Sequence, residues 1–184
     1  MKEITIFTPT YNRANLLTRL YQSLKMQTCR EFQWLIVDDG STDDTKNMVE
    51  KFIQDDEIAI KYYYQKNSGK HVAHNLGVKM CDTELFCCVD SDDSLTNDAV
   101  QTVLECWRKK TTDEKTLLSG IVAYRGYNTE KIIGTEFPAG MNEAALKDLY
   151  ANGKKGDTAL VYRTDVLRPV SYTHLRAHET AANL

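Results

Sequence analysis

Cysteine patterns that bind zinc or form disulfide frameworks are missing from this sequence. Its five cysteines, an odd number, include no pair in the C-x-x-C spacing of zinc sites and no spacing typical of disulfide-rich domains. We therefore expect reduced thiols that serve as ordinary core or surface residues in a cytoplasmic setting.

Long apolar runs and an excess of basic residues are missing as well. No stretch approaches the ~20 apolar residues of a membrane span, and no signal peptide precedes the first apolar run. We expect a cytoplasmic protein with no transmembrane segment, and a peripheral position at the inner face of the membrane is the alternative. The net charge of −3 argues against a nucleic-acid partner, because phosphate backbones favour basic surfaces. The sequence does not indicate an oligomeric state.

Short apolar runs alternate with amphipathic segments through the first part of the chain. Strands are expected at residues 4–7, 34–37, 58–64 and 85–89, and helices at residues 14–26, 41–52, 71–79 and 97–108. Pro9 is expected to end the first strand, and Ser41 to cap the second helix. This alternation predicts an α/β fold with a mostly parallel sheet and helices on both faces.

The pattern weakens in the later part of the chain. A strand is expected at residues 118–124, a short helix at 143–150 and another strand at 159–162. Residues 1–170 are expected to form one domain. Residues 171–184 do not continue the pattern and resemble translated adapter or vector sequence, so we expect a non-native tail there.

A polar loop follows each of the first four expected strands. These loops cover residues 8–13, 38–41, 67–70 and 90–93. In a parallel sheet they share the carboxyl edge, which is where open α/β sheets bind their ligands. Four such loops on one edge predict a ligand site more strongly than any one loop does.

The fourth loop carries three carboxylates within four residues, namely Asp90, Asp92 and Asp93. Such a cluster needs a cation or several hydrogen-bond donors to offset its repulsion. Hard oxygen ligands suit Mg²⁺ or Mn²⁺, which can bridge to diphosphate oxygens. The alternative is a solvated acidic turn in which an aspartate caps the next helix.

The second and third loops predict contacts to a nucleotide. Asp38 or Asp39 can accept a base N–H or a ribose hydroxyl, and the alternative is a turn with a helix cap. Residues 67–70 can bring backbone N–H groups and the Lys70 ammonium group near phosphate at a helix start, without the spacing of a P-loop. Asn75, on the following helix, is either a buried polar contact below this loop or an exposed residue.

Together, the four motifs over residues 3–110 resemble the bacterial family 2 glycosyltransferases, whose GT-A fold is Rossmann-like. The resemblance implies a UDP-sugar donor, a divalent metal (Mn²⁺ or Mg²⁺) and a base read by Asp39, with Pro9 and Tyr11 lining the base pocket. It implies that Asp92 or Asp93 meets the metal while the neighbouring aspartate meets ribose or sugar, and the candidate metal set is Asp90, Asp92 and Asp93. It also gives a nucleotide-binding set of Thr8, Pro9, Tyr11, Arg13, Asp38, Asp39, Asn67, Gly69, Lys70, Asn75, Asp90, Ser91 and Asp92.

The resemblance further implies transfer with inversion to a hydroxyl of a saccharide or lipid-linked acceptor, in cell-surface polysaccharide or glycoconjugate synthesis. The general base of such enzymes lies in a later segment, which the suspect tail replaces here, so we expect poor transfer by this chain. Asp157 is a weak candidate for the base. Two alternatives stay open, a non-catalytic nucleotide-sugar-binding domain and a sugar-phosphate nucleotidyltransferase. The first loop lacks the glycines that nucleotidyltransferases use to hold a triphosphate.

Overall fold

A computed structural model describes residues 2–128, 130–151 and 153–170, and the expected non-native tail at 171–184 lies outside the described residues. The described chain forms two compact units. The first contains residues up to 121 together with those from 160 onward, and the second contains residues 122–159. None of the helices in the described part of the chain has the length and hydropathy that crossing a bilayer requires.

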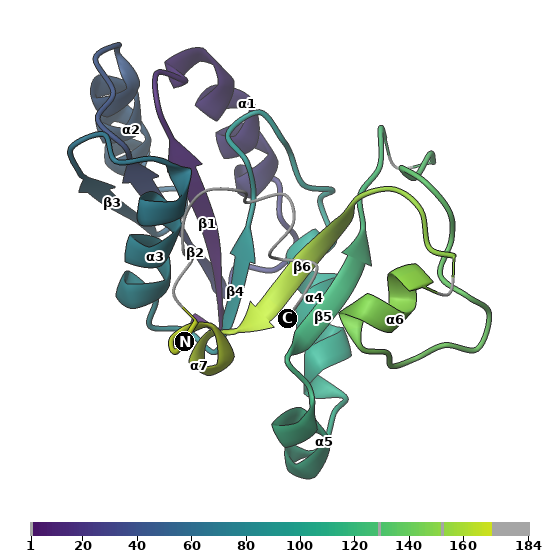
Figure 1. Ribbon diagram of the computed structural model, residues 1–184. Coiled ribbons are helices and arrows are strands. Elements are labelled where there is room, and N and C mark those ends of the chain that lie inside the picture. Colours follow the sequence, from purple (N-terminus) through teal and green to yellow (C-terminus); the bar gives the residue numbers. More distant parts are fainter. Residues whose placement is uncertain (1, 129, 152, 171–184) are drawn as a thin grey trace. The chain divides into compact units, whose positions relative to one another are not determined.

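The strands form a six-stranded sheet in the order β3-β2-β1-β4-β6-β5 (Figure 1). β1 pairs in parallel with β2 and β4, β2 pairs in parallel with β3, and β4 pairs antiparallel with β6. The expected mostly parallel sheet is confirmed. The strands are β1 (Ile4–Thr10), β2 (Phe32–Asp38), β3 (Ile60–Tyr64), β4 (Leu85–Cys88), β5 (Gly120–Tyr124) and β6 (Thr158–Arg163).

Helices cover both faces of this sheet. Apolar residues of α1 (Ala14–Lys25), α2 (Thr45–Asp55) and α4 (Ala99–Arg108) pack with alternate residues of β1 and β2 in one core. α3 (Lys70–Met80) packs on the opposite face, in a second core that contains Phe7, Leu35 and Phe86. Because helices cover both faces, every residue of β1 and β2 is buried, and not only alternate ones.

Gly77 sets the distance between α3 and the sheet. A methyl group at this position would lie 2.3 Å from the ring of Phe7, well inside van der Waals contact. Phe7 is fully buried and stacks on Phe86, so its ring has little room to move. The glycine therefore permits the helix backbone to approach β1 closely.

The expectation that Pro9 ends the first strand was wrong, because β1 continues to Thr10 and Pro9 pairs with Val37 of β2. The backbone of Phe7 faces β4, where its carbonyl accepts from Val89, so Pro9 two residues later faces the same side. β4 has ended at that level, since its last pair is Cys88 with Phe7. The missing N–H of proline therefore leaves no gap in the ladder.

The starts of α2 and α4 differ from expectation. α2 begins at Thr45 rather than at Ser41, and the hydroxyl of Ser41 accepts the backbone N–H of Asn12 instead of capping the helix. The start of α2 is held by Asp43, whose carboxylate accepts from the backbone and hydroxyl of Thr45 at 3.0 and 2.5 Å. The fourth helix begins at Ala99 after Asp98, two residues later than expected.

Two helices of the described chain were not expected, α5 (Thr112–Leu117) and the short α7 (Thr164–Leu167), and α5 had a signal in the sequence. α5 carries a capping box in which Thr111 and Glu114 each accept from the other's backbone, at 3.3 and 2.7 Å. The Thr-x-x-Glu spacing was therefore a readable signal in the sequence. The expected short helix is α6 (Leu146–Ala151), which begins later than the expected residue 143.

The second unit is organised around a buried lysine. Tyr124 and Phe137 stack with ring centroids 4.3 Å apart, and the ammonium group of Lys154 lies 5.8 and 5.6 Å from those centroids. The same group donates to the backbone carbonyls of Thr135 and Lys155 at 2.6 and 2.8 Å. Cation–π contacts and carbonyl oxygens together satisfy this buried charge.

Candidate functional site

The candidate site lies at the carboxyl edge of the parallel strands, at the top of Figure 1. From β1 the chain moves outward to β2 and β3, and then crosses back to place β4 on the other side of β1. The strand order therefore reverses between β1 and β4, which is where open α/β sheets form their ligand crevice. The loops after β1, β2, β3 and β4 are here called the first, second, third and acidic loops.

Asn12 joins the first loop to the second. Its side-chain oxygen accepts from the backbone of Thr42 at 2.8 Å and of Asp43 at 3.3 Å, and its own N–H donates to Ser41. The backbone of Asn12 adopts a left-handed conformation at φ +50°, which asparagine tolerates better than most residues. Asp43 completes the connection by accepting from the backbone of Ala14 at 3.2 Å.

Hydrogen bonds stabilise the ionised carboxylate of Asp43 at this connection. Burial acts to raise the pKa of the Asp43 carboxyl, but the hydrogen bonds from Thr45 and Ala14 outweigh it and leave the pKa below its ordinary value. Asp43 therefore stays ionised while it holds the first loop against the start of α2.

Asp38 is fully buried at the end of β2. Its carboxylate accepts from the backbone N–H of Ser41 and from the hydroxyl of Tyr62, both at 2.7 Å. Burial, and then the hydrogen bond to this carboxylate, raise the pKa of the Tyr62 phenol above its ordinary value. The carboxylate of Asp38 therefore stabilises the second loop from below and does not lie on the open surface of the rim.

Asp39 joins the second loop to the third. It is 5% exposed, and its carboxylate accepts from the side chain of Gln65 at 2.6 Å and from the backbone of Ser68 and Gly69, each at 2.8 Å. Gly40 lies against the third loop, since a methyl group on Gly40 would come within 2.6 Å of the backbone nitrogen of Asn67. The second and third loops therefore form one hydrogen-bonded unit.

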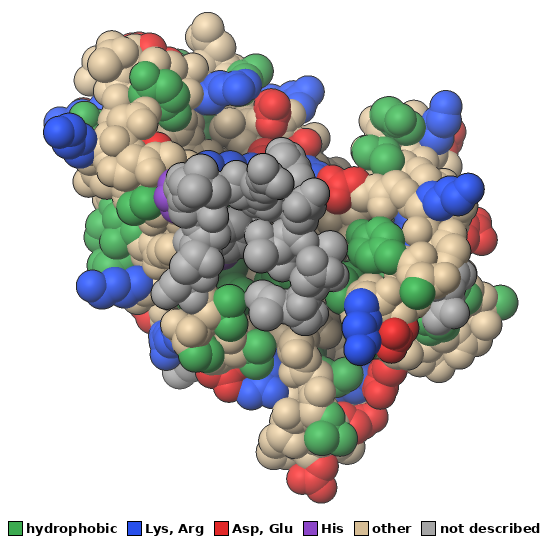
Figure 2. All heavy atoms as spheres, in the orientation of Figure 1, with side chains coloured by type: hydrophobic (Ala, Val, Ile, Leu, Met, Phe, Trp, Pro, Cys, Tyr) green, Lys and Arg blue, Asp and Glu red, His purple; other side chains and the backbone are tan. Residues whose placement is uncertain are grey.

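Ion pairs join the acidic loop to its neighbours. Lys70, at the start of α3, lies 2.6 Å from a carboxylate oxygen of Asp90. Arg13, in the first loop, lies 3.8 Å from a carboxylate oxygen of Asp92. Figure 2 shows basic and acidic side chains side by side along the upper margin of the first unit. All four groups are partly exposed to solvent, unlike Asp38 and Asp39.

The three acids of the fourth loop are not gathered into one cluster. Within the described ranges, no group of three or more His, Cys, Asp or Glu residues could hold a metal ion. Asp90 and Asp92 point to Lys70 and Arg13, and the backbone N–H of Asp93 donates to the Asp90 carbonyl in a turn. Two carboxylates at the rim are still a sufficient protein contribution for Mg²⁺ or Mn²⁺, which take remaining ligands from phosphate and water.

The other expected nucleotide-binding residues lie at different depths. Thr8 is fully buried, where its hydroxyl accepts from the Trp34 indole at 3.0 Å, so its side chain belongs to the core. Pro9 and Ser91 are also buried, Asn75 is half-buried on α3, and Asn67 is exposed. Tyr11 is 47% exposed at the rim, and Gly69 takes a left-handed φ of +97°.

Three residues that organise the site were not expected from the sequence, namely Asn12, Tyr62 and Gln65. Each acts through a hydrogen bond to a residue at least 24 positions away, such as Gln65 to Asp39. Of the three, only Asn12 had a local signal, because asparagine after a strand is typical of left-handed turn positions.

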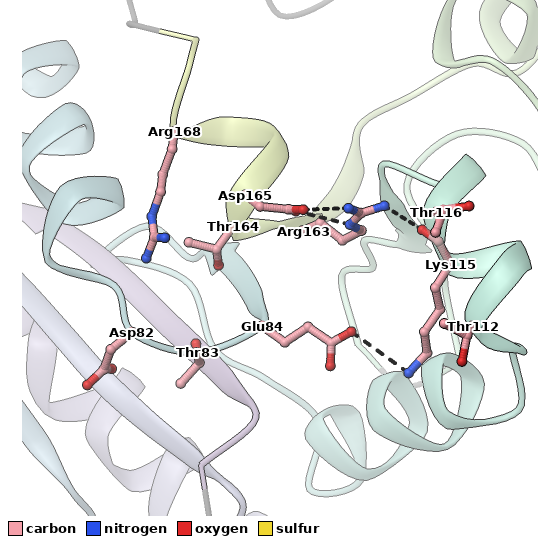
Figure 3. Close-up of a pocket in the computed structure, with 10 residues that line it drawn as sticks. All are labelled: Asp82, Thr83, Glu84, Thr112, Lys115, Thr116, Arg163, Thr164, Asp165 and Arg168. Carbon is pink, nitrogen blue, oxygen red and sulfur yellow. Dashed lines mark hydrogen bonds and ion pairs between the residues drawn. The ribbon is translucent and has the colours of Figure 1, made fainter.

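A cavity of about 460 Å³ lies elsewhere in the first unit, between the amino end of β4, α5 and α7 (Figure 3). Its charged groups bind one another: Lys115 pairs with Glu84, and Arg163 pairs with Asp165. Arg168 donates to the carbonyl of Cys81 at 2.9 Å. These contacts support the packing of α5 and α7, and the carboxyl edge is the better candidate site.

The amino-acid sequence matches a known protein family. The sequence profile described as Glycosyl transferase family 2 matches residues 5–162, which is most of the chain. The chain belongs to glycosyl transferase family 2. The expected family is thereby confirmed.

Relatives of this family 2 chain include much longer proteins. It is 32% identical over 132 residues to chondroitin synthase of Escherichia coli, with 68% of this chain and 19% of that protein covered. It is 33% identical over 106 residues to the teichoic acid poly(glycerol phosphate) polymerase of Staphylococcus epidermidis, with 57% of this chain and 15% of that protein covered. The chain therefore spans less than a fifth of either relative.

The fold of this family 2 chain also matches solved structures. TarS of S. aureus in complex with UDP-GlcNAc superposes with a TM-score of 0.72 at 25% identity, covering 91% of this chain and 47% of that one. The expected GT-A fold is confirmed by this likeness.

Proposed function

We propose that this family 2 chain binds a nucleotide-diphospho-sugar, specifically a UDP-sugar, together with Mn²⁺ or Mg²⁺. The observation that carries the proposal is the pairing of two rim carboxylates, Asp90 and Asp92, with two rim cations, Lys70 and Arg13. A metal–diphosphate ligand requires both kinds of group at one place, carboxylates for the metal and cations for the phosphate oxygens.

Asp90 and Asp92 are the residues that would hold the metal. Their oxygens are hard ligands at an exposed edge, and their present partners are long side chains that can move away. When bound, the metal neutralises charge that develops on the departing diphosphate. We propose Asp93 as a supporting member of the same loop.

The rest of the rim would hold the nucleoside and the phosphates. Tyr11 offers an exposed ring above the end of β1 for the base, and Asp39 would accept the uracil imide N–H in addition to its three present donors. A carboxylate has about four acceptor positions, so a fourth partner is chemically possible. Gly69 and Lys70 would face the diphosphate from the start of α3.

We further propose that the protein transfers the sugar with inversion to an acceptor hydroxyl, in the synthesis of a cell-surface polysaccharide or glycoconjugate. That the relatives include a chondroitin synthase and a teichoic acid polymerase supports this role. The reaction needs a general base near the acceptor hydroxyl. Asp157 is a poor candidate, since its carboxylate is already engaged by Arg125 and by the backbone of Thr158.

Calorimetry of UDP, GDP and CDP with Mn²⁺ present tests the donor assignment. UDP is expected to bind most tightly, and removal of the metal with a chelator is expected to weaken it. Asp92→Asn should lower the metal-dependent affinity, whereas Asp98→Asn, a similar change at the start of α4, should not. Equal binding of all three nucleotides without metal dependence would refute the assignment.

Two other functions make different predictions. A nucleotidyltransferase would form a nucleotide-sugar from a sugar phosphate and a nucleoside triphosphate, so product analysis separates it from a sugar transferase. A sugar transferase is expected to hydrolyse the UDP-sugar slowly when Mn²⁺ is added. A non-catalytic domain would bind the UDP-sugar without hydrolysing it. Donor hydrolysis with and without Mn²⁺ therefore tests whether the site is chemically competent.

A further inference from the structure

We propose that Lys70 and Arg13 are place-holders that exchange partners when the donor binds. Before binding, each cation neutralises one aspartate of the acidic loop. On binding, the metal takes the aspartates and the two cations move to the phosphate oxygens. This inference rests on the proposed function and adds a specific role for the two ion pairs.

The way the four loops are joined supports an exchange of partners at the acidic loop. The first, second and third loops are tied by hydrogen bonds to backbone groups, such as those from Asn12 and Asp39. The side chains of Asp90 and Asp92 are instead joined to the neighbouring loops by ion pairs between side chains. The first, second and third loops are therefore preformed, and the acidic loop can change its ion-pair partners without disturbing them.

Exposure makes the two ion pairs easy to break. The side chains of Lys70 and Asp90 are 65% and 37% exposed, and those of Arg13 and Asp92 are 51% and 56% exposed. Solvent screens such pairs, so each pair changes the equilibrium constant for metal binding by only about twofold to fivefold. A divalent ion and a diphosphate carry more charge than the groups they replace, so both exchanges favour the bound state.

The exchange predicts opposite effects on the two ligands. Each pair must break before the metal can bind alone, so the cations oppose metal binding in the absence of nucleotide. The same cations favour the diphosphate once the metal is present. Metal and diphosphate therefore assist each other's binding, and the assistance is reciprocal.

The test measures Mn²⁺ binding to the 184-residue chain by electron paramagnetic resonance, first without nucleotide. Lys70→Met is expected to bind Mn²⁺ about twofold to fivefold more tightly than Lys66→Met, the matched control. Lys66 is an exposed lysine of the third loop, shortly before Lys70 in the chain, so its removal changes the net charge equally. Lys70→Arg keeps the positive charge and is expected to behave as the wild type does.

The second measurement is UDP binding with Mn²⁺ at saturation. Lys70→Met should now weaken UDP several-fold while leaving uridine, which has no phosphate, unchanged. Thermal unfolding verifies that each variant is folded. A Mn²⁺ affinity of Lys70→Met no higher than that of Lys66→Met would overturn the place-holder role, and so would a lack of Mn²⁺ binding in both. A wild type that fails to bind UDP would refute the proposed function instead, and the metal-only comparison would still decide the exchange.

Discussion

Asp39 accepts a hydrogen bond from the backbone N–H of Gly69 at 2.8 Å, so a carboxylate after β2 fixes a turn after β3. Asp39→Asn replaces one acceptor oxygen with a donor NH₂ group that faces existing donors. We expect the free energy of unfolding to fall by about 1–3 kcal/mol, the range for a buried polar group that loses its partner. Urea denaturation measures this loss.

Amide hydrogen exchange locates the effect of Asp39→Asn. The backbone amides of Ser68 and Gly69 should lose protection, because both donate to this carboxylate. Asp44→Asn, at an exposed aspartate before α2, is the control and should leave both amides protected. Unchanged protection in Asp39→Asn would show that the turn is held by other contacts.

Gly40→Ala is expected to separate the second and third loops. The new methyl group would meet the Asn67 nitrogen at 2.6 Å, and the backbone of Gly40 has a φ of +87°. We expect the free energy of unfolding to fall by roughly 2–5 kcal/mol, the sum of a left-handed alanine and a steric clash. Gly140→Ala is a matched control, since its φ is +77° and nothing lies within 4 Å. If both variants lose the same stability, the clash contributes nothing.

Gly77→Ala tests the close approach of α3 to β1. Alanine favours helix by about 1 kcal/mol over glycine, but overpacking against the ring of Phe7 costs about 1–3 kcal/mol. We expect net destabilisation in thermal unfolding, and partial recovery when Phe7→Leu is added to make room. A Gly77→Ala variant more stable than the wild type would show that the ring can move aside.

His74 makes stability depend on pH. Burial, and then the charge of Lys70, lower the pKa of His74 to about 4, against about 6.5 in an unfolded chain. The folded state therefore binds fewer protons, and its advantage is full above pH 6.5 and is lost as the pH falls toward 4. We expect this residue to account for about 2 kcal/mol of lost stability between pH 7 and pH 5.

Denaturation at several pH values checks the role of His74. His74→Gln should flatten the slope between pH 7 and pH 5, whereas His71→Gln, the other histidine of α3, should keep it. Equal slopes in the wild type and in His74→Gln would contradict the assignment. The edge-on contacts of His74 with Phe7 and Phe86 explain why a charged imidazole is disfavoured there.

Local patterns predicted the elements well and the contacts between loops poorly. The expected helix at residues 71–79 and the observed α3, Lys70–Met80, differ by one residue at each end, because helical periodicity is a local signal. The predictions that Pro9 ends the first strand and that Ser41 caps the second helix failed for the same reason. A proline is tolerated where the neighbouring strand has ended, and a serine can serve another loop, so both outcomes depend on tertiary structure.

The same limit applies to the candidate site. The sequence predicts that the four loops share one edge, because parallel strands place their carboxyl ends together. It does not predict that Thr8 points into the core toward Trp34, or that Asp39 holds the third loop. Those facts depend on which face of the strand a side chain occupies and on partners many residues away.

The two kinds of connection between the loops respond differently to electrolyte. Screening shortens the reach of exposed charges from about 10 Å at 0.1 M salt to about 3 Å at 1 M, while buried hydrogen bonds change little. A concentrated neutral salt should thus release the acidic loop from Lys70 and Arg13 and leave the Asp39 connection intact. Ionic strength therefore sets how completely the rim is assembled before its ligand arrives.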